Sequence, residues 1–486
     1  MKRKIFALVT ALVSAVGFSL SCSAESLNYG YNDDYGYGNE IDYNEPSWDD
    51  YDPAWDMDFT YLGSFHDRDS GFSAEMFKGG AVISGCEKSD SRIVVPEKIG
   101  DKNVIAIGEY AFQGNQSIID VKLPKGLKYI GKGAFGNCAD LKSVEFPEGL
   151  LSIDQGAFFN CGLEAVQFPD SLTSIGTEAF WQCLSLTSAE LSDSIERIGS
   201  FAFKESGIKQ AYLPEKLDYL GKGAFENCSN LETVSFAHCP AVIEEFTFSN
   251  CEKLKTVTLA NGLTAIEQNA FYGCGITDIE FYEGLIRIES QAFMDCKQLG
   301  GIQFPERLIT VGDSAFEGCE SLEYVNMTDD ISDLGEFAFS KCGSLKSIQF
   351  SSKLKEIPES AFSYCSELKS VVIPEGVGII RQEAFAWCEG LEEIYIPDSV
   401  NTISSKAFLM EDTSKITIIG NYNSYARSYA SRYTISFKVD AAHQGQVKVM
   451  MIVMISVWSA VLVICLIMLV KAGIRKKDNN SGKGDI

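Results

Sequence analysis

Histidine is nearly missing from this sequence, which holds His66, His238 and His443 and no others. None of them recurs beside a serine or cysteine nucleophile in a repeated pattern. In the closest case, His238-Cys239, neighbouring side chains of an extended chain point to different sides, so we interpret the pair as a turn variant rather than a catalytic dyad. The sequence also lacks a glycine-rich phosphate loop and the ligand spacing of a zinc site. We therefore expect no enzyme activity, no cofactor and no metal.

Positive charge is scarce as well. The chain has 41 Lys and Arg against 67 Asp and Glu, a formal net charge of −26, which makes nucleic acid an unsuitable partner. Residues 25–58 contain no Lys or Arg and are rich in Asp, Glu, Tyr and Gly without a helical or strand period. We predict a disordered segment there and favour a flexible spacer over an adhesive or calcium-binding arm, because EF-hand spacing is missing.

The N-terminus has the pattern of an export signal. Lys2, Arg3 and Lys4 precede an apolar run, and small residues follow it, which predicts a signal peptide over residues 1–24 that is removed after Ala24. Acylation of Cys22 after cleavage just before it is the alternative. It is less favoured because serine stands at position 19, where such a site normally has leucine.

A second apolar run lies near the C-terminus. Residues 449–470 are uncharged, and as a helix they would extend about 33 Å, enough to span a bilayer once. Lys471, Arg475, Lys476 and Lys477 follow, and such a basic cluster marks the cytoplasmic side of a membrane helix. We favour a single-pass anchor over a buried soluble helix, with an outward-facing central region and a cytoplasmic tail of residues 471–486.

The central region is a repeat. Ala-Phe or a close variant recurs every 22 or 23 residues. The phenylalanines of this pattern are Phe112, Phe135, Phe158, Phe180, Phe203, Phe225, Phe248, Phe271, Phe293, Phe316, Phe339, Phe362, Phe385 and Phe408.

Each unit contains one predicted strand. In one unit, Leu141, Val144 and Phe146 match the L-x-x-L-x-L core of leucine-rich repeats, and the apolar period of two indicates a short strand. Pro147 ends it, since proline donates no ladder hydrogen bond. A unit of this size cannot bury its apolar side chains alone, so we expect the units to stack into one solenoid core, with covers at both ends.

The run Ile-Gly-x-x-Ala-Phe-x-x-Cys-x-x-Leu-x-x-Val-x-Phe-Pro resembles the BspA-like leucine-rich repeat family over about residues 59–438. That resemblance implies a bacterial cell-surface protein, or one from some protists, that attaches to host or matrix proteins and to other microbes. The chain departs from wall-sorted surface proteins because no wall-sorting motif precedes its apolar helix.

A cysteine stands three residues after most of the repeat phenylalanines. Buried structural thiols, disulfides between coils and metal ligands are the three interpretations. Structural thiols are favoured, because free cysteine is well suited to a buried column. Disulfides are disfavoured, because parallel side chains keep the Cβ atoms of neighbouring coils farther apart than a disulfide prefers. Metal binding is disfavoured, because sulfur atoms in one straight row cannot surround a metal tetrahedrally. The column contains Cys138, Cys161, Cys183, Cys228, Cys251, Cys274, Cys296, Cys319, Cys342, Cys365 and Cys388.

Exposed strand positions are where repeat proteins usually recognise partners, and exposed aromatics are enriched at binding hot spots. For any single residue, an ordinary strand surface is the competing interpretation. The predicted ligand-binding face contains Glu145, Gln167, Glu190, Tyr212, Glu280, Gln303, Tyr324, Asn326, Gln349 and Tyr395.

Together these observations predict an α/β-type leucine-rich repeat solenoid, a right-handed superhelix with short parallel strands, plus one C-terminal transmembrane helix. Its expected function is to bind an extracellular protein or glycan at the cell membrane, in adhesion; a structural or assembly role in the cell envelope is the alternative. The predicted divisions are 1–24 signal peptide, 25–58 acidic segment, 59–107 N-terminal cap, 108–415 repeats, 416–438 C-terminal cap, 439–448 linker, 449–470 membrane helix and 471–486 tail.

Overall fold

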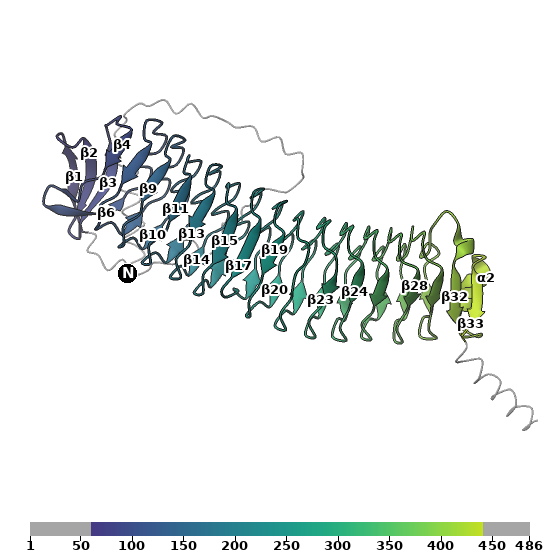
Figure 1. Ribbon diagram of the computed structural model, residues 1–486. Helices are drawn as coiled ribbons and strands as arrows, with labels where there is room; N and C mark the ends of the chain where they lie inside the picture. Colours follow the sequence, from purple (N-terminus) through teal and green to yellow (C-terminus); the bar gives the residue numbers. More distant parts are fainter. Residues whose placement is uncertain (1–59, 441–486) are drawn as a thin grey trace, which may run out of the picture. The chain divides into compact units, whose positions relative to one another are not determined.

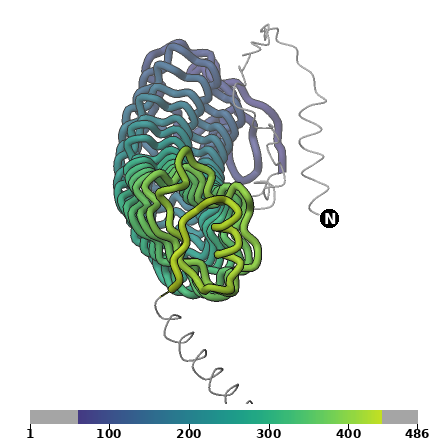
Figure 2. The backbone as a smooth tube through the Cα atoms, turned by 90° about the vertical axis from the view of Figure 1, so that its right-hand side faces the viewer, coloured from purple at the N-terminus to yellow at the C-terminus, as the bar shows by residue number. Residues whose placement is uncertain are grey.

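The structure is a computed structural model that describes residues 60–440. Within this range the chain forms one continuous stack of coils, with one repeat in each coil (Figure 1). Viewed along the stack, successive coils follow nearly the same path (Figure 2). The predicted signal peptide, acidic segment, membrane helix and cytoplasmic tail lie outside the described residues. Between residues 60 and 440, no helix has the length and apolarity needed to cross a membrane.

One side of the stack is formed by short parallel strands at the predicted Leu-x-x-Val-x-Phe positions, which confirms that prediction. Strands of neighbouring coils pair in register, as Val144 does with Val121. In the coil after β19 the strand is reduced to a single bridge between Thr256 and Asp278. The strands of this first column are β4 (Arg92–Val94), β7 (Asp120–Lys122), β9 (Ser143–Glu145), β11 (Ala165–Gln167), β13 (Ser188–Glu190), β15 (Gln210–Leu213), β17 (Thr233–Phe236), β19 (Thr256–Thr258), β22 (Ile302–Gln303), β24 (Tyr324–Asn326), β26 (Ser347–Gln349), β28 (Ser370–Val372), β30 (Glu393–Tyr395), β32 (Thr417–Gly420) and β33 (Ser436–Val439).

A second column of parallel strands occupies another side of each coil, at the Ile-Gly position. These strands were not predicted from the sequence, because most contain two residues, too few to show a period of two. Their paired isoleucines, such as Ile153 and Ile175, are fully buried. The strands are β6 (Lys102–Ile107), β8 (Tyr129–Ile130), β10 (Ser152–Ile153), β12 (Ser174–Ile175), β14 (Arg197–Ile198), β16 (Tyr219–Leu220), β18 (Val242–Ile243), β20 (Ala265–Ile266), β21 (Arg287–Ile288), β23 (Thr310–Val311), β25 (Asp333–Leu334), β27 (Glu356–Ile357), β29 (Ile379–Ile380) and β31 (Thr402–Ile403).

The third side of each coil consists of turns around Ala-Phe. Here alternate residues bond to the next coil: the Phe135 N–H donates to the Ala157 carbonyl and the Asn137 N–H to the Phe159 carbonyl, both at 2.7 Å. Asn137 has a φ of 60°, a left-handed conformation that asparagine tolerates. The helical part of the expected α/β class is therefore wrong for the coils. In the described range the α-helix α2 (Tyr425–Arg432) and the 3-10 turn η1 (Thr413–Lys415) both come after the last repeat phenylalanine.

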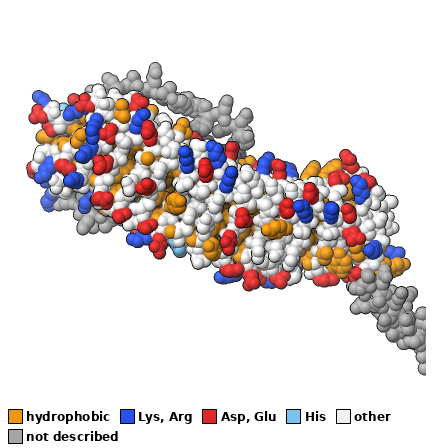
Figure 3. All heavy atoms as spheres, viewed as in Figure 1, with side chains coloured by type: hydrophobic (Ala, Val, Ile, Leu, Met, Phe, Trp, Pro, Cys, Tyr) orange, Lys and Arg blue, Asp and Glu red, His pale blue; other side chains and the backbone are white. Residues whose placement is uncertain are grey.

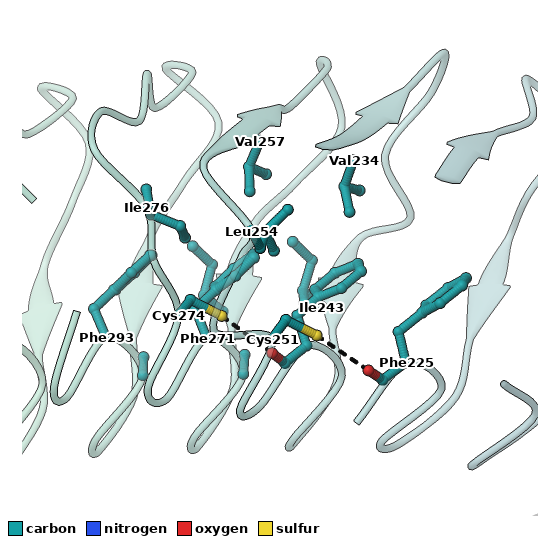
Figure 4. Packing of buried hydrophobic residues seen from close by; sticks show 14 of the residues in the cluster. Phe225, Val234, Ile243, Cys251, Leu254, Val257, Phe271, Cys274, Ile276 and Phe293 are labelled. Carbon is teal, nitrogen blue, oxygen red and sulfur yellow. Dashed lines mark hydrogen bonds between the residues drawn. The ribbon is translucent and has the colours of Figure 1, made fainter. Parts of the chain in front are cut away.

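The core is a column of stacked phenylalanine rings. From Phe112 to Phe408, consecutive rings are 4.9 to 5.8 Å apart between centroids and within 13° of parallel. Buried leucine, isoleucine and valine columns pack against them, as Figure 4 shows for the coils around Phe271. Each side chain thus hides its surface against the coil before and the coil after it, as predicted from the repeat.

Both ends of the phenylalanine column are covered by an aromatic ring turned on edge. At the start, strands β1 (Tyr61–Asp67), β2 (Phe72–Phe77) and β3 (Ala81–Cys86) form antiparallel hairpins. Strand β5 (Lys98–Ile99) pairs with β6. The ring of Phe72 meets the ring of Phe112 edge-on, with 6.4 Å between centroids. At the other end, Tyr429 of α2 meets Phe408 edge-on at 5.9 Å. Ser424 caps α2 by accepting a hydrogen bond from the Arg427 N–H.

Candidate ligand-binding face

The outward side of the first strand column is a regular surface, which we call the strand face. In β9, Val144 is buried while Ser143 and Glu145 are exposed, because side chains alternate along a strand. In-register pairing repeats this arrangement in each coil, so the strand face has two rows, one before and one after the buried central residue. The predicted residues were chosen mainly from the row after it.

Most of the predicted residues lie together in that row and are exposed: Glu145, Gln167, Glu190, Tyr212, Glu280, Gln303 and Gln349. Tyr212 is the most prominent, with 68% of its surface exposed. Asn326 lies between Gln303 and Gln349 in register but is half-buried. The strand face thus brings these side chains into one line, as the sequence predicts.

Tyr395 and Tyr324 differ from the expectation. Tyr395 is half-buried rather than exposed, and burial raises the pKa of its phenol, with the carboxylates of Glu375, Asp440 and Asp398 adding to the shift. Tyr324 is 53% exposed but belongs to the other row, where it pairs with Ser347. Tyr324 is therefore not in line with Tyr212.

Tyr324 is positioned by a glycine of the preceding coil. Gly301 occupies the equivalent place there, and a Cβ atom at Gly301 would lie 2.3 Å from the Tyr324 ring carbon Cζ. The ring therefore lies against the bare backbone of Gly301 and leaves its other side to solvent. The sequence contained this signal, a glycine 23 residues before an exposed tyrosine, but register was needed to recognise it.

Apart from Tyr324, the residues predicted from the sequence do not include the row before the central residue. It is composed largely of small or neutral side chains, such as Ser143, Ser188, Thr233 and Thr256. The alternation of exposed and buried positions in each strand identifies this row as directly as the other. The left-out residues therefore extend the candidate face to two rows.

Two ion pairs between neighbouring coils lie beside the strand face. Lys142 bonds to Glu164 at 3.4 Å, and Lys346 bonds to Glu323 at 3.0 Å. These positions immediately precede the strands. In Figure 3, which shows one side of the stack, acidic and basic side chains are interspersed along its length. The strand face itself is polar, and the charged residues in its predicted row are the exposed acids Glu145, Glu190 and Glu280.

The cysteine column is part of the core. Each of its eleven thiols donates to the carbonyl oxygen of the repeat phenylalanine one coil earlier, at 3.0 to 3.3 Å. Figure 4 shows this bond between Cys251 and Phe225. Burial raises the pKa of these thiols, to about 11 for Cys138 and about 12 for Cys183. The thiols therefore satisfy buried backbone groups and are poor nucleophiles.

Cys239 and His238 do not form a catalytic pair. Cys239 is buried, its sulfur accepts a hydrogen bond from the Ala260 N–H at 3.1 Å, and burial raises its pKa to about 11. His238 is exposed in the adjoining turn. Throughout residues 60–440, no three His, Cys, Asp or Glu side chains are grouped so that they can hold a metal ion.

Comparison with known proteins gives a family and a fold. The family described as BspA type Leucine rich repeat region matches residues 105–232, 173–300, 221–335 and 286–417. A leucine-rich repeat protein from Bacteroides ovatus is similar in structure, with a TM-score of 0.59 and 24% identity over 76% of this chain and 98% of that one. A leucine rich cell surface protein from Faecalibacterium prausnitzii is 27% identical over 76% of this chain and 97% of that one, with a TM-score of 0.42. No curated protein matches.

Proposed function

Because this chain belongs to the BspA type leucine-rich repeat family, we propose that it is a cell-surface binding protein whose strand face recognises an extracellular protein or glycan in adhesion. Membership of this repeat family supports a role in protein interaction. The proposal assigns the solenoid to binding and gives it no catalytic step.

The observation that carries the proposal is the strand face itself. It runs along the coils as two exposed rows of mostly polar side chains, from which Tyr212 and Tyr324 project. Exposed tyrosines combine a large contact area with a hydroxyl group, and they lose little conformational entropy on binding. An extended face of this kind suits a macromolecular partner better than a small substrate.

The location at the cell surface rests on the ends of the sequence. The export signal predicted over residues 1–24 and the membrane helix predicted over residues 449–470 would hold the solenoid outside the cell, with residues 471–486 inside. Protease added to intact cells should then degrade the solenoid and spare the tail. Protection of the solenoid under these conditions would contradict the proposed orientation.

Binding is tested with the full-length chain reconstituted in liposomes. These liposomes are applied to immobilised matrix proteins, to glycans and to intact cells. We expect retention by at least one class. Replacement of both Tyr212 and Tyr324 by serine should weaken that retention at least tenfold, since removing a hot-spot side chain typically costs about 2 kcal/mol or more.

Leu184→Ser is the matched control. Leu184 is 70% exposed but lies in the turn after Cys183, outside the strands that form the strand face. Its substitution should leave retention unchanged. Failure to bind any class would reject adhesion, and co-purification with envelope proteins of the same cell alone would favour the structural role instead.

A further inference from the structure

A second candidate site lies away from the strand face, at the turn side of the coils. A recess of about 330 Å³ opens there, and its lining includes Asn250, Glu252, Tyr272, Asp295, Lys297 and Gln298. These residues belong to three successive coils. The middle coil, which contributes Tyr272, forms the floor.

The first cause of the recess is a shortened coil. Two residues separate Cys251 from Leu254 in the preceding coil, and two separate Cys296 from Leu299 in the following coil, but Gly275 alone separates Cys274 from Ile276. The shorter path draws the backbone inward. A Cβ at Gly275 would lie 2.3 Å from the Glu252 carbonyl oxygen, so the contact requires glycine.

The second cause is a missing side chain in the same coil. In most coils the residue two positions after the repeat phenylalanine contributes a side chain to a row along the stack, in which the Asn250 Nδ2 donates to the Asn227 Oδ1 at 3.1 Å. Gly273 interrupts this row, and Asp295 continues it in the next coil. The other shortened coils, at Gly162 and Gly207, keep a side chain at this position, Asn160 and Glu205. Of these three coils, the coil of Gly273 combines the shortened segment with the missing side chain.

The side chains around the recess suit hydroxyl groups. Asn250 and Gln298 offer amides, Glu252 and Asp295 offer carboxylate acceptors, and Tyr272 offers an aromatic ring. Lys297 is paired with Glu320 at 3.0 Å, so its charge is compensated from outside the recess. The two carboxylates disfavour an anionic ligand.

From this geometry we propose that the recess binds a single uncharged sugar residue of a glycan. Its volume lies at the lower end of the range for ligand pockets, roughly 300 to 1,000 Å³, which suits one sugar ring rather than a peptide segment. Sugar hydroxyls would bond to the amides and carboxylates, and the apolar face of the ring would contact Tyr272. This site is separate from the strand face and does not depend on it.

The test uses the full-length chain in detergent and a panel of six sugars: glucose, galactose, mannose, fucose, N-acetylglucosamine and N-acetylgalactosamine. Each sugar is measured free by saturation-transfer NMR and immobilised on an array. We expect at least one sugar to bind. The variant Gly273→Asn fills the gap in the row with a residue that the same position holds in other coils at the same backbone conformation, such as Asn250 with a φ of 57°. It should reduce sugar binding at least tenfold while the chain stays folded.

Gly114→Asn is the matched control. Gly114 has the same position in its coil and a φ of 72°, but it does not line the recess, and no atom lies within 4 Å of a Cβ placed there. The Gly114→Asn variant should bind sugar as the unaltered chain does. The variant in which both Tyr212 and Tyr324 are replaced by serine should also bind sugar normally. No detectable binding of any of the six sugars, or normal sugar binding by Gly273→Asn, would overturn the proposal. Loss of binding in the tyrosine double variant would instead place the sugar on the strand face.

Discussion

The thiol of Cys251 donates a hydrogen bond to the carbonyl oxygen of Phe225, one coil earlier, at 3.2 Å. The same oxygen also accepts from the Cys228 N–H at 3.2 Å. The cysteine column therefore links each coil to the one before it through the backbone of the phenylalanine column. This relationship explains why cysteine recurs with phenylalanine and leads to the first three predictions.

Cys251→Ala should lower the free energy of unfolding by about 1 to 2 kcal/mol, because it removes one buried hydrogen bond and leaves a small cavity. Cys251→Ser should cost less, since a hydroxyl can donate to the same carbonyl and Ser206 already stands at this position in another coil. Denaturant unfolding of the three chains measures both effects. Equal losses in the alanine and serine variants would argue against the hydrogen bond.

The column thiols should resist iodoacetamide at pH 8 in the folded chain, because burial keeps them protonated and inaccessible. After unfolding in guanidinium without reductant, all eleven should react, since the thirteen cysteines between residues 60 and 440 are free in the structure. Mass spectrometry counts the modified residues. Widespread protection in the unfolded chain would reveal disulfides.

The chain should lose stability in alkali. Burial raises the pKa of the Cys183 thiol from 9.0 to about 12. Above pH 9 the unfolded chain releases this proton while the folded chain retains it, so stability falls by about 1.4 kcal/mol per pH unit for that thiol until the folded pKa is reached. The free energy of unfolding, measured by denaturant at pH values from 8 to 10.5, should therefore decline less steeply with pH for Cys183→Ala than for the unaltered chain. Parallel declines would contradict the burial effect.

Phe271→Ala should destabilise the chain by about 3 to 5 kcal/mol, as for other large core aromatics. Phe271 is fully buried and stacks on Phe248 and Phe293. Phe159→Ala is the control, because Phe159 is half-buried on the turn side and should cost clearly less. Similar losses in the two variants, measured by denaturant unfolding, would show that the phenylalanine column has no special role in the core.

Gly301→Ala should weaken ligand binding at the strand face as Tyr324→Ser does, because the added methyl group occupies the place of the Tyr324 ring. The free energy of unfolding should change by less than about 1 kcal/mol, since the ring is exposed. Gly300→Ala is the control: its Cβ would be 3.8 Å from the Thr277 carbonyl oxygen, an ordinary contact. Normal binding by the Gly301 variant would show that the ring position does not matter.

The strands after the cysteines and the phenylalanine core were predictable from the sequence. Both rest on a pattern that repeats many times. The second strand column was not predicted, because two residues show no period. The helical part of the predicted α/β-type class was wrong for the coils, because nothing in Ala-Phe itself reveals that alternate residues bond to the next coil.

The sequence by itself determined the architecture of residues 60–440, because each repeat can bury its apolar side chains only against neighbouring copies. Tertiary structure alone decided which residues meet across coils. It placed the Tyr324 ring against Gly301, partly buried Tyr395, and brought residues of three successive coils together around the recess at Gly273. Such contacts join residues about 23 positions apart, and their geometry depends on the register between coils, which no single repeat contains.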